Sequence, residues 1–364
     1  MHASFRLSRR QVTLLVFLIT VCVTPFTYDS VLLLYLDRQA WLGLVPALAV
    51  GLLGCAVAGT LAARFPGRSI VEYVPEILGP VAGRAFLLLL GLVLLAGAPG
   101  NLHVFARVVR FSELPRTPPF WIAALIVPIV GYACYGGPEV IARASEVLAP
   151  FVLLGLAVIY FAPIVGTVVP ARLAPTHPFP WASYWLPAVS SSLGTVRGFL
   201  ALLVLGGSAD EPERLRGPAM IATACAWVLL ALSVALPVAV LGAGFSAELR
   251  YPILGVTGTI SFRWLPFQRI TAITILVWQM LMYTVLAFYL WSGVLVLCAA
   301  LGIRNWRPWL LVGAAVAVYL GGVPLSPPTS RDVVDLWNFA VLAMGVVLPA
   351  SLLLLGGERR RSAV

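Results

Sequence analysis

The fold of this chain is decided by residues 11–36, QVTLLVFLITVCVTPFTYDSVLLLYL. This stretch exceeds the roughly 20 apolar residues that a helix needs to cross a hydrocarbon layer about 30 Å thick, yet it carries Pro25 and Asp29 near its centre. Non-helical backbone and carboxyl groups survive at that depth only when they are buried in protein or line a cavity. The stretch therefore predicts a membrane span that is broken halfway and enclosed by other helices.

The whole chain is apolar. Of its 364 residues, 61% are hydrophobic and only 10% are charged, with a mean hydropathy of +0.99. Soluble domains average about 45–50% apolar and about 25% charged residues. We therefore predict an all-α integral membrane protein of about ten transmembrane helices in a single domain, residues 1–364. The predicted spans are residues 11–36, 41–63, 84–106, 119–136, 140–165, 186–206, 218–242, 270–300, 307–323 and 336–355.

The sixth span is broken in a similar way to the first. Residues 190–198, SSSLGTVRG, are polar and glycine-rich and precede an apolar tail. Interrupted segments at corresponding positions of two halves indicate an inverted repeat with a binding site at the membrane midplane. We therefore expect a 5+5 inverted repeat with broken first and sixth helices, its halves at about 11–165 and about 186–355.

The net charge of +10 depends on arginine alone, because the sequence contains no lysine. Fourteen of the 24 arginines flank the spans on the side of the termini, nine lie on the other side, and Arg197 lies inside a span. This bias predicts cytoplasmic tails at 1–10 and 356–364. Arginines that punctuate apolar runs indicate a lipid bilayer as the surroundings and exclude a nucleic-acid partner.

Several motifs make the chain similar to a known family. Residues 64–79, RFPGRSIVEYVPEILG, and 137–151, GPEVIARASEVLAPF, resemble segments of the permease-like B subunits of spore germination receptors, the GerA-type nutrient receptors. Residues 114–118, 39–41 and 251–252 fit the same pattern. The resemblance is collinear over nearly the whole chain.

This resemblance implies an amino-acid-permease-like fold of the amino acid/polyamine/organocation transporter superfamily and a location in the inner membrane of the spore. It also implies association with A-type and C-type receptor subunits. The implied role is the sensing of a small-molecule germinant, an amino acid or similar metabolite, at the unwound first and sixth helices. The alternative is an active secondary transporter of amino acids or organic cations, coupled to protons or sodium.

The candidate ligand-binding residues cluster at the two interruptions. In such a fold the second half of a broken helix offers free N–H groups to a substrate carboxylate. Asp29 is placed to cap these groups itself, which favours a cationic or amine-bearing ligand. The candidates are Thr24, Phe26, Thr27, Tyr28, Asp29, Asn101, Ser191, Ser192, Gly194, Thr195, Arg197 and Gln279.

Asp29 and Arg197 carry opposite charges into the membrane. An arginine there costs at least about 2.5–3.5 kcal/mol and needs a partner, so we hypothesise that the two meet between the broken helices. Snorkelling of Arg197 to an interface, or pairing with backbone carbonyls, is the alternative.

Glu139, Arg143 and Glu146 lie at i, i+4 and i+7 on one face of the fifth span. This spacing is typical of a helix-stabilising salt bridge, and a gate or docking face is the functional alternative. We expect no catalytic residue, no metal site and no cofactor. The three histidines lie far apart in sequence, and no nucleophile, metal-binding or phosphate-binding motif occurs.

Overall fold

The computed structural model describes residues 6–22, 26, 28–165, 168–175, 178–179, 189–194, 196–260, 271–323 and 327–361. Within these ranges the regular structure is helical, apart from one isolated bridge between Leu7 and Ala209. The main helices are α1 (Arg9–Cys22), α2 (Asp29–Leu36), α3 (Val45–Arg64), α5 (Pro80–Ser112), α6 (Pro119–Gly136), α7 (Pro138–Phe161), α9 (Val189–Leu193), α10 (Phe199–Leu205), α11 (Arg216–Leu241), α14 (Thr271–Ala300), α15 (Trp309–Gly322), α16 (Pro327–Leu342) and α17 (Leu348–Arg361).

Seven helices in the described part of the chain are long and apolar enough to cross a membrane. They are Asp29–Arg64, Pro80–Ser112, Pro119–Gly136, Pro138–Ile164, Arg216–Leu241, Thr271–Ala300 and Arg331–Leu354. The segment Phe199–Ser208 and α15 are shorter apolar helices, and α1 is the first half of the broken first span. The described helices therefore follow all ten predicted stretches.

The first two predicted spans are joined by a helical connection. Residues Asp37–Leu44 form a 3-10 helix that joins α2 to α3. The chain turns at Asp37, whose φ of 48° and ψ of −128° form a conformation that residues other than glycine rarely adopt. Hydropathy alone does not detect this joint, because a short polar turn and a polar helical turn have the same composition.

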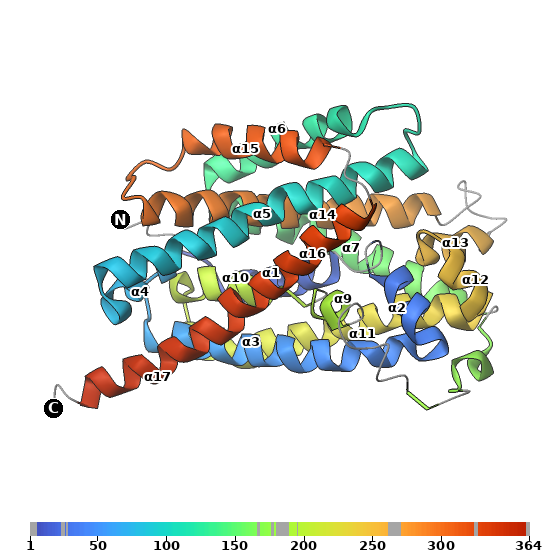
Figure 1. Ribbon diagram of the computed structural model, residues 1–364, viewed down its shortest axis with the longest axis horizontal. Coiled ribbons are helices and arrows are strands. Elements are labelled where there is room, and N and C mark those ends of the chain that lie inside the picture. The colour runs from blue at the N-terminus through green and yellow to red at the C-terminus, as the bar shows by residue number, and fades with distance from the viewer. Residues whose placement is uncertain are drawn as a thin grey trace.

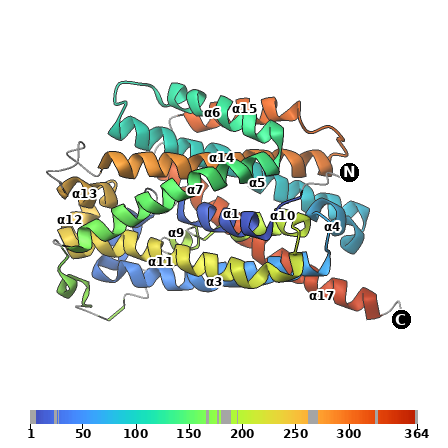
Figure 2. The same ribbon diagram turned by 180° about the vertical axis from the view of Figure 1, so that it is seen from behind.

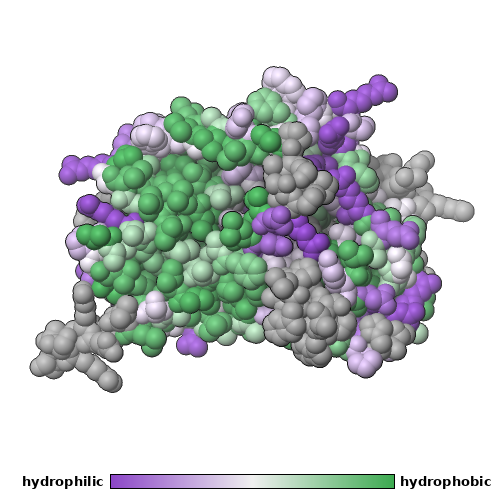
Figure 3. Space-filling view, in the orientation of Figure 1, coloured by the Kyte–Doolittle hydropathy of each residue, from purple (hydrophilic) through white to green (hydrophobic). Residues whose placement is uncertain are grey.

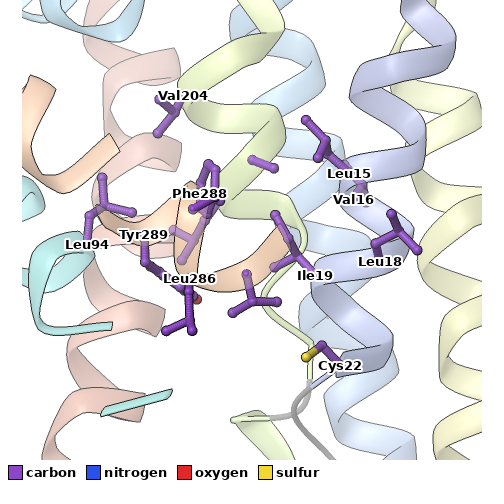
Figure 4. Close-up of a cluster of buried hydrophobic side chains, with 14 of the residues drawn as sticks. Leu15, Val16, Leu18, Ile19, Cys22, Leu94, Val204, Leu286, Phe288 and Tyr289 are labelled. Atoms are coloured by element: carbon purple, nitrogen blue, oxygen red, sulfur yellow. The ribbon is translucent and has the colours of Figure 1, made fainter. Parts of the chain in front are cut away.

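The helices run side by side along the longest axis of the molecule (Figures 1 and 2). Helix α14 lies at the centre, with 89% of its most apolar window buried, whereas the value for α6 at the periphery is 28%. Side chains of α1, including Leu15 and Ile19, pack toward Phe288 and Tyr289 of α14 (Figure 4). This core encloses both interrupted helices, as their polar residues require.

The outer surface suits a lipid environment. Large apolar side chains such as Leu89, Leu125 and Ile129 are exposed on α5 and α6. Hydrophobic residues cover the left and central part of the face seen in Figure 3, and hydrophilic residues gather along its edges and toward its right-hand end. Exposed apolar area of this extent is typical of a membrane-embedded surface.

Short helices connect the spans at the two ends of the bundle. Helix α4 (Ile70–Leu78) buries the stripe Ile70, Tyr73, Val74 and Ile77, as its amphipathic pattern predicts. Helices α12 (Ala243–Glu248) and α13 (Pro252–Thr259) lie at the opposite end. The described ends of the chain lie at the same end of the long axis as α4, as an even number of spans requires (Figures 1 and 2).

Candidate functional site

The two interrupted helices meet at glycine contacts. Helix α1 ends at Cys22 and α2 begins at Asp29, while α9 ends at Leu193 and α10 begins at Phe199. A Cβ atom on Gly198 would overlap the carbonyl oxygen of Val16 in α1, and one on Gly194 would lie 2.6 Å from the hydroxyl of Tyr28. At Gly198 a side chain would push the two backbones apart, and at Gly194 it would displace the side chains of Tyr28 and Asn338.

Arg197 lies in the break between α9 and α10 and is only 2% exposed. Its Nη2 atom donates to Asn338 Oδ1 at 2.7 Å and to the hydroxyl of Tyr28. The guanidinium carbon lies 4.1 Å from the ring centroid of Trp337, and its Nε atom is buried without a hydrogen-bond partner. The cation is thus held by neutral oxygens and an aromatic face.

Helix α16 supplies the other side of this polar network. Asn338 Nδ2 donates to the carbonyl oxygen of Ser190 at 3.1 Å, and Ser190 Oγ donates to Asp335 at 2.6 Å. Trp337 Nε1 donates to the Val93 carbonyl of α5 at 2.8 Å. The network joins the first, sixth and tenth helical segments, and a change at one of them is felt at the others.

Asp29 occupies the first turn of α2 and is only 1% exposed. Ser233 of α11 donates to its Oδ1 atom at 3.3 Å, while Oδ2 is buried and has no hydrogen-bond partner. Tyr160 of α7 is an electrostatic neighbour of Asp29 and bonds with Ser233. A carboxyl group in the first turn is stabilised by the positive end of the helix dipole.

The predicted ion pair between Asp29 and Arg197 is wrong for this structure. No described carboxylate lies within 4.0 Å of the Arg197 guanidinium, and Asp29 bonds to α11 instead. Tyr28 and Asp29 are neighbours in sequence, yet their side chains bond to different helices. Asp29 bonds with Ser233, and Arg197 bonds with Tyr28 and Asn338, so the two residues have separate partners.

An apolar cavity lies beside the break in the first helix. It is lined by Phe26, Tyr160, Trp278 and neighbouring apolar residues of α7, α13 and α14. The volume of the cavity is about 20 Å³, which is room for about one water molecule. The cavity is therefore too small for a metabolite in this conformation.

Aromatic rings cover this cavity. Phe26 lies 4.6 Å from Trp278 and 5.9 Å from Tyr251, measured between ring centroids, and Phe111 lies 5.1 Å from Tyr251. Burial raises the pKa of the Tyr251 hydroxyl, so this ring stays uncharged near neutral pH. These tilted and edge-on contacts connect the lining of the cavity, Phe26 and Trp278, to Tyr251 and Phe111.

The remaining predicted ligand residues divide into three groups. Ser191, Ser192 and Gly194 are buried beside the network, and the neighbouring Ser190 makes hydrogen bonds within it. Asn101 donates to the Gly97 carbonyl of its own helix at 2.7 Å, and Gln279 donates to the exposed Glu113 at 3.1 Å, so neither bonds with the central groups. The third group, Thr24, Thr27 and Thr195, lies outside the described residues.

The acidic face of α7 holds the start of the chain. Arg143 lies 3.8 Å from Glu139, as the spacing predicts, and the Arg143 side chain is 74% exposed. Glu139 also accepts from the backbone N–H of Arg6 at 3.1 Å, and Glu146 accepts from Gln11 at 2.9 Å. The face is therefore a contact between α7 and the N-terminal segment rather than an isolated intrahelical pair.

The contribution of α16 was not predicted from the sequence. Trp337 and Asn338, at the start of the predicted tenth span, contact Arg197, and Asp335, just before that span, bonds with Ser190 of the same network. The polar residues within TSRDVVDLWNF, 329–339, are the signal that could have identified them, because such residues at the start of a span need partners.

The family follows from the sequence as a whole. The model of the spore germination protein family matches residues 6–324. This chain belongs to that family. It is also 25% identical over 225 residues to spore germination protein KB of Bacillus subtilis strain 168, a match that covers 61% of the chain and 60% of the relative. The match thus spans less than two thirds of the curated relative's length.

Solved structures identify the fold of this spore germination protein. Two crystal structures of mutant forms of the manganese transporter of Eremococcus coleocola superpose with a TM-score of 0.63 at 14% identity, over 94% of this chain and 78% of theirs. At that identity the likeness concerns the fold alone. The protein is a multi-pass membrane protein with a transporter fold, so the predicted fold class is confirmed. The predicted membership of the germination receptor family is confirmed as well.

Proposed function

We propose that this family member is the germinant-sensing, permease-like subunit of a spore germination receptor. It binds a small metabolite, an amino acid or a related amine, between the broken first and sixth helices. The observation that carries the proposal is the pair of buried, separately held ionisable side chains, Asp29 and Arg197, at those breaks. Charged groups inside a membrane protein are costly and usually serve binding or transport rather than stability.

The free Oδ2 atom of Asp29 makes a ligand ammonium group the natural partner on this side of the site. The apolar part of such a ligand would lie in the cavity beside Phe26 and Tyr160. Because that cavity has room for about one water molecule, the ring of Phe26 must separate from Trp278 before a metabolite can enter. Binding is thereby coupled to a movement of the broken helix.

Sensing follows from this coupling. A ligand that binds only the open arrangement shifts the population toward it, and neighbouring subunits read that shift. We propose A-type and C-type receptor subunits as those neighbours and the inner membrane of the spore as the location, with the termini on the cytoplasmic side. The proposed role involves no catalysis and no cofactor.

The second candidate is an active secondary transporter of amino acids or organic cations. The observation that favours it is the transporter fold, shared over 94% of the chain. In this candidate Asp29 is the proton or sodium site, because intramembrane carboxyl groups serve as such sites in pumps and transporters.

Paired binding and uptake assays separate the two candidates. The purified chain in liposomes is offered radiolabelled amino acids and small amines, with and without proton and sodium gradients. Saturable binding without gradient-driven uptake supports the sensor. Concentrative uptake supports the transporter and overturns the sensor. Absence of saturable binding for every compound overturns the assignment of these compound classes.

A further inference from the structure

We propose that Arg107 and Arg250 form an anion-binding site at the entrance to the cavity, which takes the carboxylate group of the metabolite. This inference rests on the proposed function and narrows the ligand to compounds that carry a carboxylate as well as an amine. Its first test uses a simple carboxylate as the probe, so the anion site and the metabolite site can fail separately.

The two arginines lie beside one aromatic ring. The guanidinium carbon of Arg250 lies 5.6 Å from the ring centroid of Tyr251, the residue that precedes α13. Arg107 lies on α5 one helical turn before Phe111, whose ring centroid lies 5.1 Å from that of Tyr251. The two cations also act electrostatically on each other and on Tyr251. They converge from two segments at the end of the bundle that carries α13 (Figures 1 and 2).

A neutral histidine contacts Arg107 from within its own helix. His103 places Nδ1 3.3 Å from the carbonyl oxygen of Gly321 in α15. Because a carbonyl oxygen only accepts, Nδ1 carries the ring proton and Nε2 accepts from Arg107 Nη1 at 3.5 Å. Arg107 is half-buried, and this long hydrogen bond leaves its other N–H groups for a further acceptor.

The charges of the two arginines are not balanced by a neighbouring acid. No described carboxylate lies within 4.0 Å of either guanidinium group. Glu113, just beyond the end of α5, accepts from Gln279 of α14 instead. Like charges that converge in this way repel each other, and a bound anion removes that repulsion. The planar fork of guanidinium N–H groups matches the oxygens of carboxylate and phosphate.

The position of the pair favours a metabolite over a lipid headgroup as the source of the anion. The ring centroid of Tyr251 lies 5.9 Å from that of Phe26, and Phe26 lines the cavity. A ligand that approaches the cavity past these rings therefore meets the two cations first. Charge of one sign at the mouth of a site also raises the rate at which an oppositely charged group arrives. A lipid phosphate offers the same chemistry, so the test separates the two sources.

The test titrates trifluoroacetate into the full chain in lipid nanodiscs and follows its fluorine NMR linewidth. In phosphatidylcholine discs we expect saturable broadening with a millimolar dissociation constant. Arg107→Gln and Arg250→Gln should each weaken binding about fivefold, the effect of about 1 kcal/mol. The same difference between wild type and variants should persist in discs that contain phosphatidylglycerol, because a lipid does not occupy the site.

Three variants control this titration. Arg116→Gln removes an exposed arginine from the loop between α5 and α6, and it should bind trifluoroacetate as the wild type does. Arg107→Lys keeps the charge and should retain more binding than Arg107→Gln. Arg250 is exposed, so Arg250→Gln should melt at the wild-type temperature and decides the test if Arg107→Gln does not fold.

The class of ligand is tested with pairs of compounds in the liposome binding assay. Leucine is compared with isoamylamine, and phenylalanine with phenethylamine, because each amine lacks only the carboxylate of its amino acid. We expect each amino acid to bind more tightly than its amine, and Arg250→Gln to reduce this difference. If none of these compounds binds, the proposed metabolite classes fail, and the trifluoroacetate titration alone decides the anion site.

Three results would overturn the inference. The first is broadening of the trifluoroacetate signal that does not saturate, or that the variants of Arg107 and Arg250 leave unchanged. The second is loss of the difference between wild type and variants in discs with phosphatidylglycerol, which would assign the site to a lipid phosphate. The third is an amine that binds as tightly as its amino acid.

Discussion

Asp29 and Arg197 lie at the two interrupted helices and are held by different partners. Asp29 lies in the first turn of α2, where the helix dipole favours negative charge, and Arg197 lies in the break between α9 and α10. Their hydrogen bonds run to α11 and α16 respectively. Each residue is therefore available to a ligand or an ion without first breaking a bond to the other.

Replacement of Asp29 tests its role directly. In Asp29→Asn the amide oxygen still accepts from Ser233, so we expect the fold to persist. A ligand ammonium group loses a charge-assisted hydrogen bond worth about 1.5–3 kcal/mol, which weakens binding about ten- to hundredfold. The liposome binding assay measures this change. Ser233→Ala is the matched control, since it leaves the carboxyl group in place. If Asp29→Asn binds the ligand with the same affinity as the wild type, Asp29 is not part of the site.

The glycine contacts make a second residue-scale prediction. Gly198→Ala forces a methyl group against the Val16 carbonyl, and overpacking of this kind costs about 1–3 kcal/mol. We expect a lower melting temperature for this variant. Gly100→Ala in α5 is the control, because a Cβ atom there meets nothing within 4 Å, and it should be neutral. Equal effects in the two variants would contradict the close approach of the sixth segment to α1.

At the scale of elements, α1 and α14 are joined where α1 ends. The indole of Trp278 donates to the Cys22 carbonyl at 3.0 Å, and its ring lies tilted against the ring of Phe26. The hydrogen bond gives a partner to a carbonyl that is buried in the bundle. Phe26 and Trp278 both line the cavity, so one residue contacts both α1 and the proposed site.

Trp278→Phe separates these two contributions. The phenyl ring retains the aromatic contact with Phe26, but the Cys22 carbonyl is left unpaired, at a cost of about 1–3 kcal/mol. Thermal unfolding should show this loss. Trp309→Phe, at a side chain that is 46% exposed, should leave the melting temperature unchanged. A stable Trp278→Phe would mean that another donor satisfies the end of α1.

On the scale of the whole molecule, the arrangement of the spans predicts which residues face the same compartment. Arg143 contacts the N-terminal segment through Glu139, while Arg250 is exposed near α13 at the opposite end of the bundle. Cytoplasmic termini place the first inside and the second outside the membrane.

Cysteine labelling measures this orientation. The background is Cys225→Ser, because Cys225 is the exposed cysteine among the five free ones. A membrane-impermeant maleimide should label Arg250→Cys in intact cells and Arg143→Cys only after permeabilisation. The reverse pattern would invert the orientation, and labelling of both from one side would contradict the even number of spans.

Hydropathy and helix-breaking residues in the sequence determined the all-helical class, the ten apolar segments and the two interruptions. These features are local, because the length of an apolar run and the effect of a polar, glycine-rich stretch depend on neighbouring residues. The division into two repeats at about 11–165 and about 186–355 stays a prediction. Neither the match to the family nor the likeness to solved structures compares the two halves with each other.

The tertiary structure alone decided the partners of the buried charges. Tyr28 and Asn338 are 310 positions apart in the sequence, yet they bond with each other and both accept from Arg197. Ser233 and Asp29, which also bond, are 204 positions apart. Charge pairing suggested that Asp29 and Arg197 would meet, but Asp29 bonds with Ser233, and Arg197 bonds with Tyr28 and Asn338. Which helices pack together decides the choice among such partners, and no local pattern in the sequence encodes it.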